Sequence, residues 1–165
     1  MSRLHIGDLL LVQGSRWIRV LTGESISHVA LVCGALGMAP RTRPYVVVTD
    51  YTLREGQRVL ALPEWLRRYR GRRLWHGQAP AEVREHRAEI ARAVREWSAE
   101  PPDYAWWELP VIWWHQLLGR PYRARGPQCH SYVYEIWRAA GYGEPPPRDP
   151  GDYLARCPVV YPLEV

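Results

Sequence analysis

The chain has 165 residues, of which 47% are hydrophobic, and it carries a formal net charge of +5. This length predicts one domain over residues 1–165, with enough apolar side chains for a core. No apolar run reaches the length of a membrane span and the first residues lack the features of a signal peptide, so we expect no transmembrane segment and a cytoplasmic or virion-associated protein.

Five short segments in the first half of the chain are rich in β-branched and aliphatic residues and are bounded by Gly or Pro, which predicts β-strands. They are residues 8–12, 26–33, 45–50, 57–62 and 72–76. Short helices are expected over residues 16–21 and over residues 63–70, where Pro63 suits a first helical turn.

The periodicity changes after Pro80, and the second half of the chain predicts helices. Val83, Ile90, Val94 and Trp97 recur at helical spacing, which predicts an amphipathic helix that ends before Pro101 and lies on the sheet. A further helix is expected over 129–140, with Gly141 as its stop, and an edge strand over 158–161. The order of strands before helices predicts an α+β fold with a mainly antiparallel sheet.

Cys129 lies at the first turn of that last helix, where the helix dipole and unpaired backbone N–H groups favour a thiolate. The same N–H groups can donate to the oxyanion of a tetrahedral intermediate. Taken alone, a cysteine at this position is also explained as a small buried hydrophobic residue.

A thiolate nucleophile needs a base, and His28 is the best placed histidine because it lies within an apolar strand, on the face that we assign to Ile26, Ala30 and Val32. A hairpin symmetric about residue 39 would pair residue 28 with residue 50, so Asp50 would lie opposite His28 and orient its imidazole. Nucleophile, base and orienting carboxylate are the parts of an acyl-transfer triad. A structural histidine, and an aspartate that starts a turn, are the alternatives.

The motifs resemble a known family. Gly7-Asp8 followed by Ser27-His28-Val29 is similar to the opening of the permuted NlpC/P60 group of papain-like cysteine hydrolases, in which a Gly-Asp strand precedes a Ser-His-Val strand. Cys129-His130-Ser131 and Pro150-Gly151-Asp152 follow in the family's order, and the likeness covers most of the chain. The chain departs from the family in having Asp50 where Glu is frequent and His130 between Cys and Ser.

The resemblance implies a circularly permuted papain-like fold, an antiparallel sheet or partial barrel packed against helices. It implies that Cys129 attacks an amide or ester carbonyl, with His28 as base and Asp50 as orienting residue. The substrate would be a peptide, a peptidoglycan-like molecule or an acyl group. The alternative is a catalytically silent binding module on the same fold, which would hold a polyanion or a protein partner.

The remaining motifs are assigned structural roles. Cys33, Cys157, His5 and His76 have no zinc-ligand spacing, so we expect no metal and no cofactor. A Cys33–Cys157 disulfide is left open.

His130 is a weak candidate for the base, because adjacent helical residues do not face each other. The arginine-rich residues 65–73 are interpreted as a solvated surface rather than a nucleic-acid site. The tryptophans at 106–107 and 113–114 are interpreted as core, with a platform for a sugar, an acyl chain or a membrane surface as the alternative.

Overall fold

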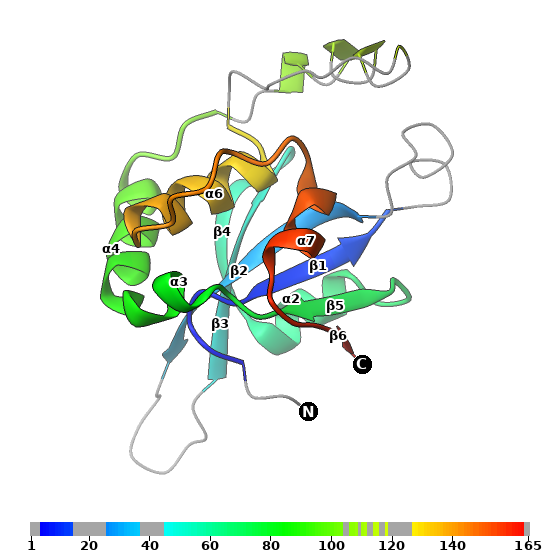
Figure 1. Cartoon of the computed structure of the whole chain (residues 1–165). Helices are drawn as coiled ribbons and strands as arrows, with labels where there is room; N and C mark the ends of the chain where they lie inside the picture. The colour runs from blue at the N-terminus through cyan, green and yellow to red at the C-terminus, as the bar shows by residue number, and fades with distance from the viewer. Residues whose placement is uncertain are drawn as a thin grey trace.

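The molecule is built on an antiparallel sheet, as seen in a computed structural model that describes residues 4–14, 26–36, 45–103, 106–108, 110–111, 114–115, 118 and 127–163. Among these residues the sheet is open and has six strands in the order β4-β3-β2-β1-β5-β6, all paired antiparallel (Figure 1). The strands are β1 (Leu9–Gln13), β2 (Ile26–Leu36), β3 (Tyr45–Thr52), β4 (Gly56–Ala61), β5 (Leu74–Gly77) and β6 (Val160–Leu163). The predicted α+β class is confirmed, and the strand ends move from the predicted ones by at most three residues.

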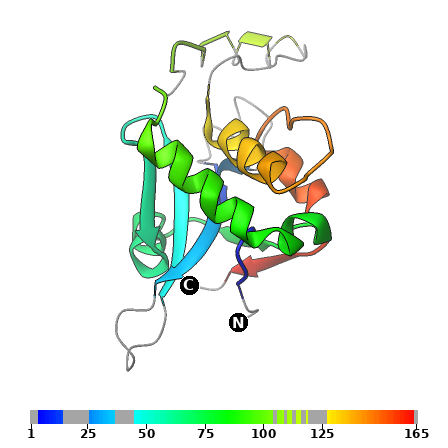
Figure 2. The same cartoon turned by 90° about the vertical axis from the view of Figure 1, so that its left-hand side faces the viewer.

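Helices cover both faces of the sheet. The described part of the chain contains α2 (Leu62–Arg68), α3 (Ala81–Glu85), α4 (Arg87–Ala99), α6 (Cys129–Ala139) and α7 (Tyr153–Arg156). Figure 2 shows α4 and α6 side by side over one face, while α2 lies on the other, where it buries Trp65 against Leu10 and Val32. The central strand β1 is therefore buried on both sides, which explains the unbroken apolar run Leu9–Val12.

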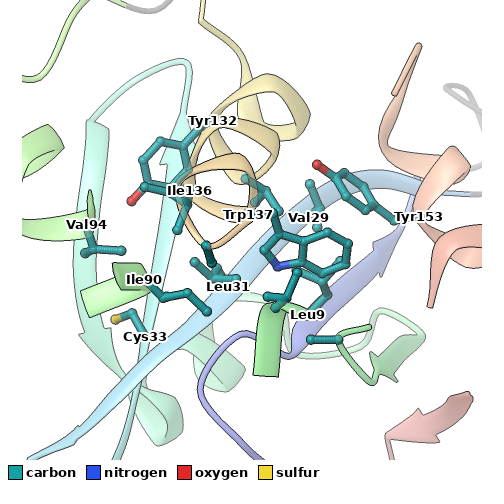
Figure 3. Close-up of a cluster of buried hydrophobic side chains, with 14 of the residues drawn as sticks. Leu9, Val29, Leu31, Cys33, Ile90, Val94, Tyr132, Ile136, Trp137 and Tyr153 are labelled. Atoms are coloured by element: carbon teal, nitrogen blue, oxygen red, sulfur yellow. The ribbon is translucent and has the colours of Figure 1, made fainter. Parts of the chain in front are cut away.

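The larger core lies between the sheet and the helices α4 and α6. Leu31, Ile90, Tyr132 and Trp137 are fully buried within it (Figure 3). Full burial of an apolar side chain stabilises the fold by about 1.5–3 kcal/mol. The indole N–H of Trp137 also donates to the carbonyl of Gly7, 3.0 Å away. These contacts hold α6, and with it Cys129, against the sheet.

Two irregularities in β2 decide which side chains share a face. The register shifts between Val32 and Gly34 in the pairing with β3, and between Val12 and Gln13 in the pairing with β1. The shift in the pairing with β1 lies between His28 and Ile26. Ile26 consequently packs under α4 and α6, whereas Ala30 and Val32 pack under α2. The prediction that Ile26 shares the face of Ala30 is wrong, because this bulge adds a residue to β2 and moves Ile26 to the other face of the sheet.

The helical segment predicted after Pro80 is two helices, because the chain turns at His86 (φ −110°, ψ 45°) between α3 and α4. The apolar stripe predicted for it does lie in the core, through Val83, Ile90 and Val94. The stop at Gly141 is confirmed by its left-handed conformation, φ 89°. The predicted helix over 16–21 lies outside the described residues.

Candidate active site

Cys129 is the first residue of α6. Gln128 precedes it in an extended conformation (φ −133°, ψ 173°), and its backbone N–H donates to the hydroxyl of Ser131 at 2.7 Å. This capping interaction marks the end of the extended segment and the start of the helix at Cys129. The thiol is 5% exposed, so it lies just beneath the surface at the positive end of the α6 dipole.

His28, on β2, and Cys129 shift each other's ionisation. Burial acts to lower the pKa of His28, but hydrogen bonds to Asp50 and Cys129 and their negative charges outweigh it and raise that pKa to about 9. Burial acts to raise the pKa of Cys129, but hydrogen bonds to His130 and His28 and their positive charges lower that pKa to about 6. Between these values the favoured state is a thiolate beside an imidazolium.

Asp50, on β3, is the third member of the predicted site, and its carboxylate lies 3.4 Å from Nε2 of His28. The predicted cross-strand register is wrong, because Asp50 pairs with Ala30 and not with His28. His28 lies two residues before Ala30 on β2, so it is the diagonal neighbour of Asp50. A diagonal neighbour across two strands is within reach of a long side chain. A shift of two residues keeps a side chain on the same face of the strand, so the contact survives the error in register.

The carboxylate of Asp50 is held by three further residues, one on β4, one on α2 and one immediately after α2. Arg58 binds it with two nitrogens, Nε to Oδ1 at 3.0 Å and Nη2 to Oδ2 at 2.8 Å. The indole of Trp65 donates at 3.1 Å and the hydroxyl of Tyr69 at 3.4 Å. Burial acts to raise the pKa of Asp50, but the hydrogen bonds and positive charges of His28 and Arg58 lower it below its usual value.

Tyr69 also covers His28, since the two rings stack with centroids 5.5 Å apart and planes 22° from parallel. Tyr69 thus contacts both the imidazole and the carboxylate that orients it. Burial, with the negative charge of Asp50 next, raises the pKa of Tyr69, so the residue remains a neutral hydrogen-bond donor.

His130 contributes to the site, contrary to the sequence argument that neighbouring helical residues point apart. Interaction with this imidazole is one of the causes that lower the pKa of the Cys129 thiol. The geometric rule applies within a helix, whereas these two residues form its first turn, where the chain is only entering helical geometry. The cysteine therefore has imidazoles from two directions, one on β2 and one on its own helix.

The pKa values of the other two cysteines are shifted in the opposite direction. Burial raises the pKa of both Cys33 and Cys157 to about 12. All three cysteines are free thiols, so Cys33 and Cys157 are not joined by a disulfide. Cys129 alone among them is set up to ionise near neutral pH.

The chain matches no model of a known protein family and no curated protein sequence. The chemistry of the site therefore has to identify its function.

An unsatisfied donor belongs to the residue that precedes Cys129 in the chain. The side-chain Nε2 of Gln128 is buried and has no hydrogen-bond partner among the described residues. A buried amide N–H without a partner costs free energy, which a ligand oxygen would recover. Gln128 is a functional candidate that the sequence argument did not single out.

Two findings concern ligands and membranes. No group of three or more His, Cys, Asp or Glu side chains suited to a metal ion occurs in the part of the chain that the structure describes. Within the same residues, no helix has the length and apolar character needed to cross a bilayer.

Proposed function

We propose that the protein is a thiol hydrolase or acyltransferase, with Cys129 as nucleophile, His28 as acid and base, and Asp50 as the residue that orients His28. The observation that carries the proposal is a cysteine at a helix start whose pKa is lowered by a partly buried imidazole, with a carboxylate 3.4 Å from that imidazole. Acyl transfer by a thiolate requires these three groups in this order: a nucleophile, a base and a carboxylate that orients the base.

In the first half of the reaction the Cys129 thiolate attacks the carbonyl carbon of an amide or ester and forms a carbon–sulfur bond. The tetrahedral intermediate collapses when the bond to the leaving nitrogen or oxygen breaks, and the His28 imidazolium gives that atom its proton. In the second half, neutral His28 takes a proton from water or an acceptor alcohol or amine as it attacks the thioester. The acyl product leaves, and the thiolate–imidazolium pair is restored.

The oxyanion of each intermediate needs donors beside the sulfur. The backbone N–H of Cys129 is one, and we assign the orphaned Nε2 of Gln128 as the second. Loss of one oxyanion donor typically lowers kcat by about 100-fold to 1000-fold. Gln128→Leu, which keeps the volume but removes the amide, is expected to fall in this range with little change in KM.

We further propose that the fold is the permuted papain-like arrangement of the NlpC/P60 group. It is supported by the chain order, in which the histidine strand β2 precedes the cysteine helix α6, and by the packing of α6 on an antiparallel sheet. The substrates that fit this proposal are an amide, such as a cell-wall peptide, or an acyl ester. The partly buried site favours a slender acyl or peptidyl group at the thiol.

The test is covalent capture of an acyl group. Purified protein is mixed with p-nitrophenyl acetate, quenched in acid and digested, and the acetyl adduct is located by mass spectrometry. We expect one acetyl group on Cys129, a burst of nitrophenol equal to the enzyme concentration, and loss of both in Cys129→Ala. Cys33 and Cys157 are internal controls of the same chemistry with raised pKa values.

His28→Ala should remove the burst while the fold, followed by circular dichroism, is retained. If Cys129 acetylates no faster than Cys33, or if His28→Ala leaves the burst unchanged, the enzyme proposal fails. A catalytically silent binding module would then be the better description of the fold.

A further inference from the structure

The Asp50 carboxylate is held more closely by Arg58 than by His28. The guanidinium of Arg58 contacts it twice, at 3.0 Å to Oδ1 and at 2.8 Å to Oδ2, whereas Nε2 of His28 lies 3.4 Å from Oδ2. A two-point contact between a guanidinium and a carboxylate fixes the plane of the carboxylate as well as its position. Arg58 therefore determines where Asp50 presents an oxygen to His28.

The oxygen that faces His28 is shared with three other donors. Besides Arg58, the indole N–H of Trp65 donates to Oδ2 at 3.1 Å and the hydroxyl of Tyr69 at 3.4 Å. A carboxylate oxygen has about two lone-pair sites, and the shortest contacts on Oδ2 are those of Arg58 and Trp65. The contact of Asp50 with His28 is consequently one of the two weaker ones on this oxygen.

The charge of Asp50 is offset by the same guanidinium. Asp50 and Arg58 lie opposite each other on β3 and β4, and the Arg58 side chain is 13% exposed, so water screens this ion pair little. Although burial acts to raise the pKa of Asp50, the hydrogen bonds and charges of His28 and Arg58 hold it below its usual value. Asp50 is thus an anion shared between two cations, and His28 experiences only part of its negative charge.

Arg58 is also the buried end of a line of alternating charges that leads to the surface. Its guanidinium pairs with Glu55, Glu55 pairs with Arg68 at 3.0 Å, and Arg68 pairs with Glu64 at 3.3 Å. The side chains of Glu55, Arg68 and Glu64 are 49%, 38% and 43% exposed, so water screens the pairs between them. Arg68 therefore has the same charge as Arg58 but much less influence on the site.

The proposed reaction requires His28 both to hold a proton and to release it. The imidazole gives its proton to the leaving group, and it has to be neutral when it takes a proton from the acceptor. The titratable groups that act on His28 are Asp50 from β3, Cys129 from α6 and Tyr69 from the segment after α2. A carboxylate whose charge is not offset would keep the imidazole protonated up to a higher pH.

We propose that Arg58 is a positioning residue of this site, which fixes the Asp50 carboxylate against His28 and offsets part of its charge, so that the imidazole can lose its proton during the reaction. This proposal rests on the roles of His28 and Asp50 in the proposed function. It adds that the carboxylate works as one member of a pair with a buried guanidinium.

The test is the titration of the His28 imidazole by NMR in a Cys129→Ala background, in which no thiolate contributes and no activity is needed. The His28 signal is identified by its absence in His28→Gln. Arg58→Gln removes the guanidinium charge and should raise the midpoint of the titration by about 0.5 pH unit or more. Arg58→Lys keeps the charge but not the two-point contact, so it should reverse most of this shift.

Two further variants are controls for charge and for hydrogen bonding. Arg68→Gln removes an arginine from the exposed part of the same line of charges, and its midpoint should not move. Tyr69→Phe removes a donor to the same oxygen without a change in charge, so its shift should be smaller than that of Arg58→Gln. An unchanged or lowered midpoint in Arg58→Gln, or an equal shift in either control, would overturn the proposal.

Glu55→Gln tests the same pair from its other side, and it applies even if Arg58→Gln does not fold. Loss of the Glu55 charge leaves the guanidinium of Arg58 to Asp50 alone, so the midpoint of His28 should fall. A rise of the midpoint in Glu55→Gln would contradict the proposed sharing of charge.

The hydrolysis of p-nitrophenyl acetate measures the positioning function separately from the charge. Arg58→Lys should lower kcat about tenfold with little change in KM, because the carboxylate is no longer fixed at two points. An unchanged kcat in Arg58→Lys would overturn the positioning function. Absence of an acetyl burst in the unaltered chain would instead overturn the proposed function, while the NMR titration would still report whether Arg58 acts on His28.

Discussion

Replacing His28 with Gln should move the pH at which Cys129 becomes reactive. In the intact protein the pKa of Cys129 is lowered to about 6 from an ordinary value of 9.0, and His28 is one of two imidazoles responsible. Gln retains a polar side chain of similar size but carries no charge. The pKa of Cys129 in His28→Gln should therefore rise, and it should rise further in His28→Gln/His130→Gln.

The size of the effect follows from two opposing factors. At pH 6 a thiol with a pKa of 6 is about half ionised. When both imidazoles are removed, burial keeps the pKa of Cys129 above its ordinary value of 9.0, so less than about 0.1% is ionised at pH 6 and the ratio exceeds roughly 500. The more basic thiolate attacks disulfides at least about 20-fold faster, so the net loss at pH 6 is about 25-fold or more, and the order of the two rates reverses only well above about pH 7.5.

The assay is the reaction with 4,4′-dithiodipyridine, followed by absorbance between pH 4 and pH 10 in a Cys33→Ala/Cys157→Ala background. Altered access to Cys129 changes the height of the rate profile at every pH, whereas its midpoint reports the pKa alone. In the intact site a second inflection is expected near pH 9, where His28 loses its proton. A midpoint of 8.5 or above before substitution, or the same midpoint in His28→Gln, would refute the electrostatic account.

Two further predictions concern stability, measured by urea unfolding. Asp50→Asn removes the buried carboxylate that pairs with Arg58 and leaves the exposed Glu55 as its remaining anion, which should lower the free energy of unfolding by about 2 kcal/mol; a loss below about 0.5 kcal/mol would mean that the pair is not effectively buried. Gly77→Ala would place a Cβ 2.6 Å from Sγ of Cys157 and should cost about 1–3 kcal/mol, most of it recovered by adding Cys157→Ala. Gly34→Ala, where the new Cβ meets nothing within 4 Å, is the control, and an equal loss there would contradict the steric explanation.

The sequence predicted the elements of the fold well because its periodicities are strong. Apolar strands bounded by Gly or Pro, the stripe through Ile90 and Val94, and the stop at Gly141 are local signals, and each lies where it was expected. The irregularities in β2 could not be predicted, since a bulge is decided by tertiary packing. The approach of Asp50 to His28 was nevertheless anticipated, because a register error of two residues preserves the face.

The other residues of the site differ in whether the sequence alone could have identified them. Arg58 could have been found, because a hairpin that turns at residue 54 places residue 58 opposite Asp50, as it is in the structure. Trp65 on α2 and Tyr69, which directly follows that helix, are four residues apart, but nothing local indicates that they meet Asp50. The orphaned amide of Gln128 is likewise visible only when the partners of every buried polar atom are known.

The site joins two parts of the chain that are made at different times. His28 and Asp50 lie in the first third of the sequence, while Cys129 arrives with α6, about a hundred residues after His28. Long-range contacts of this kind form late in folding, because the loop between them has to close first. During synthesis the cysteine therefore remains an ordinary thiol until α6 docks, for example through the 2.8 Å hydrogen bond between Tyr132 and Thr49. A reactive thiolate exists only in a chain that has finished folding, which spares the ribosome-bound intermediate from premature modification.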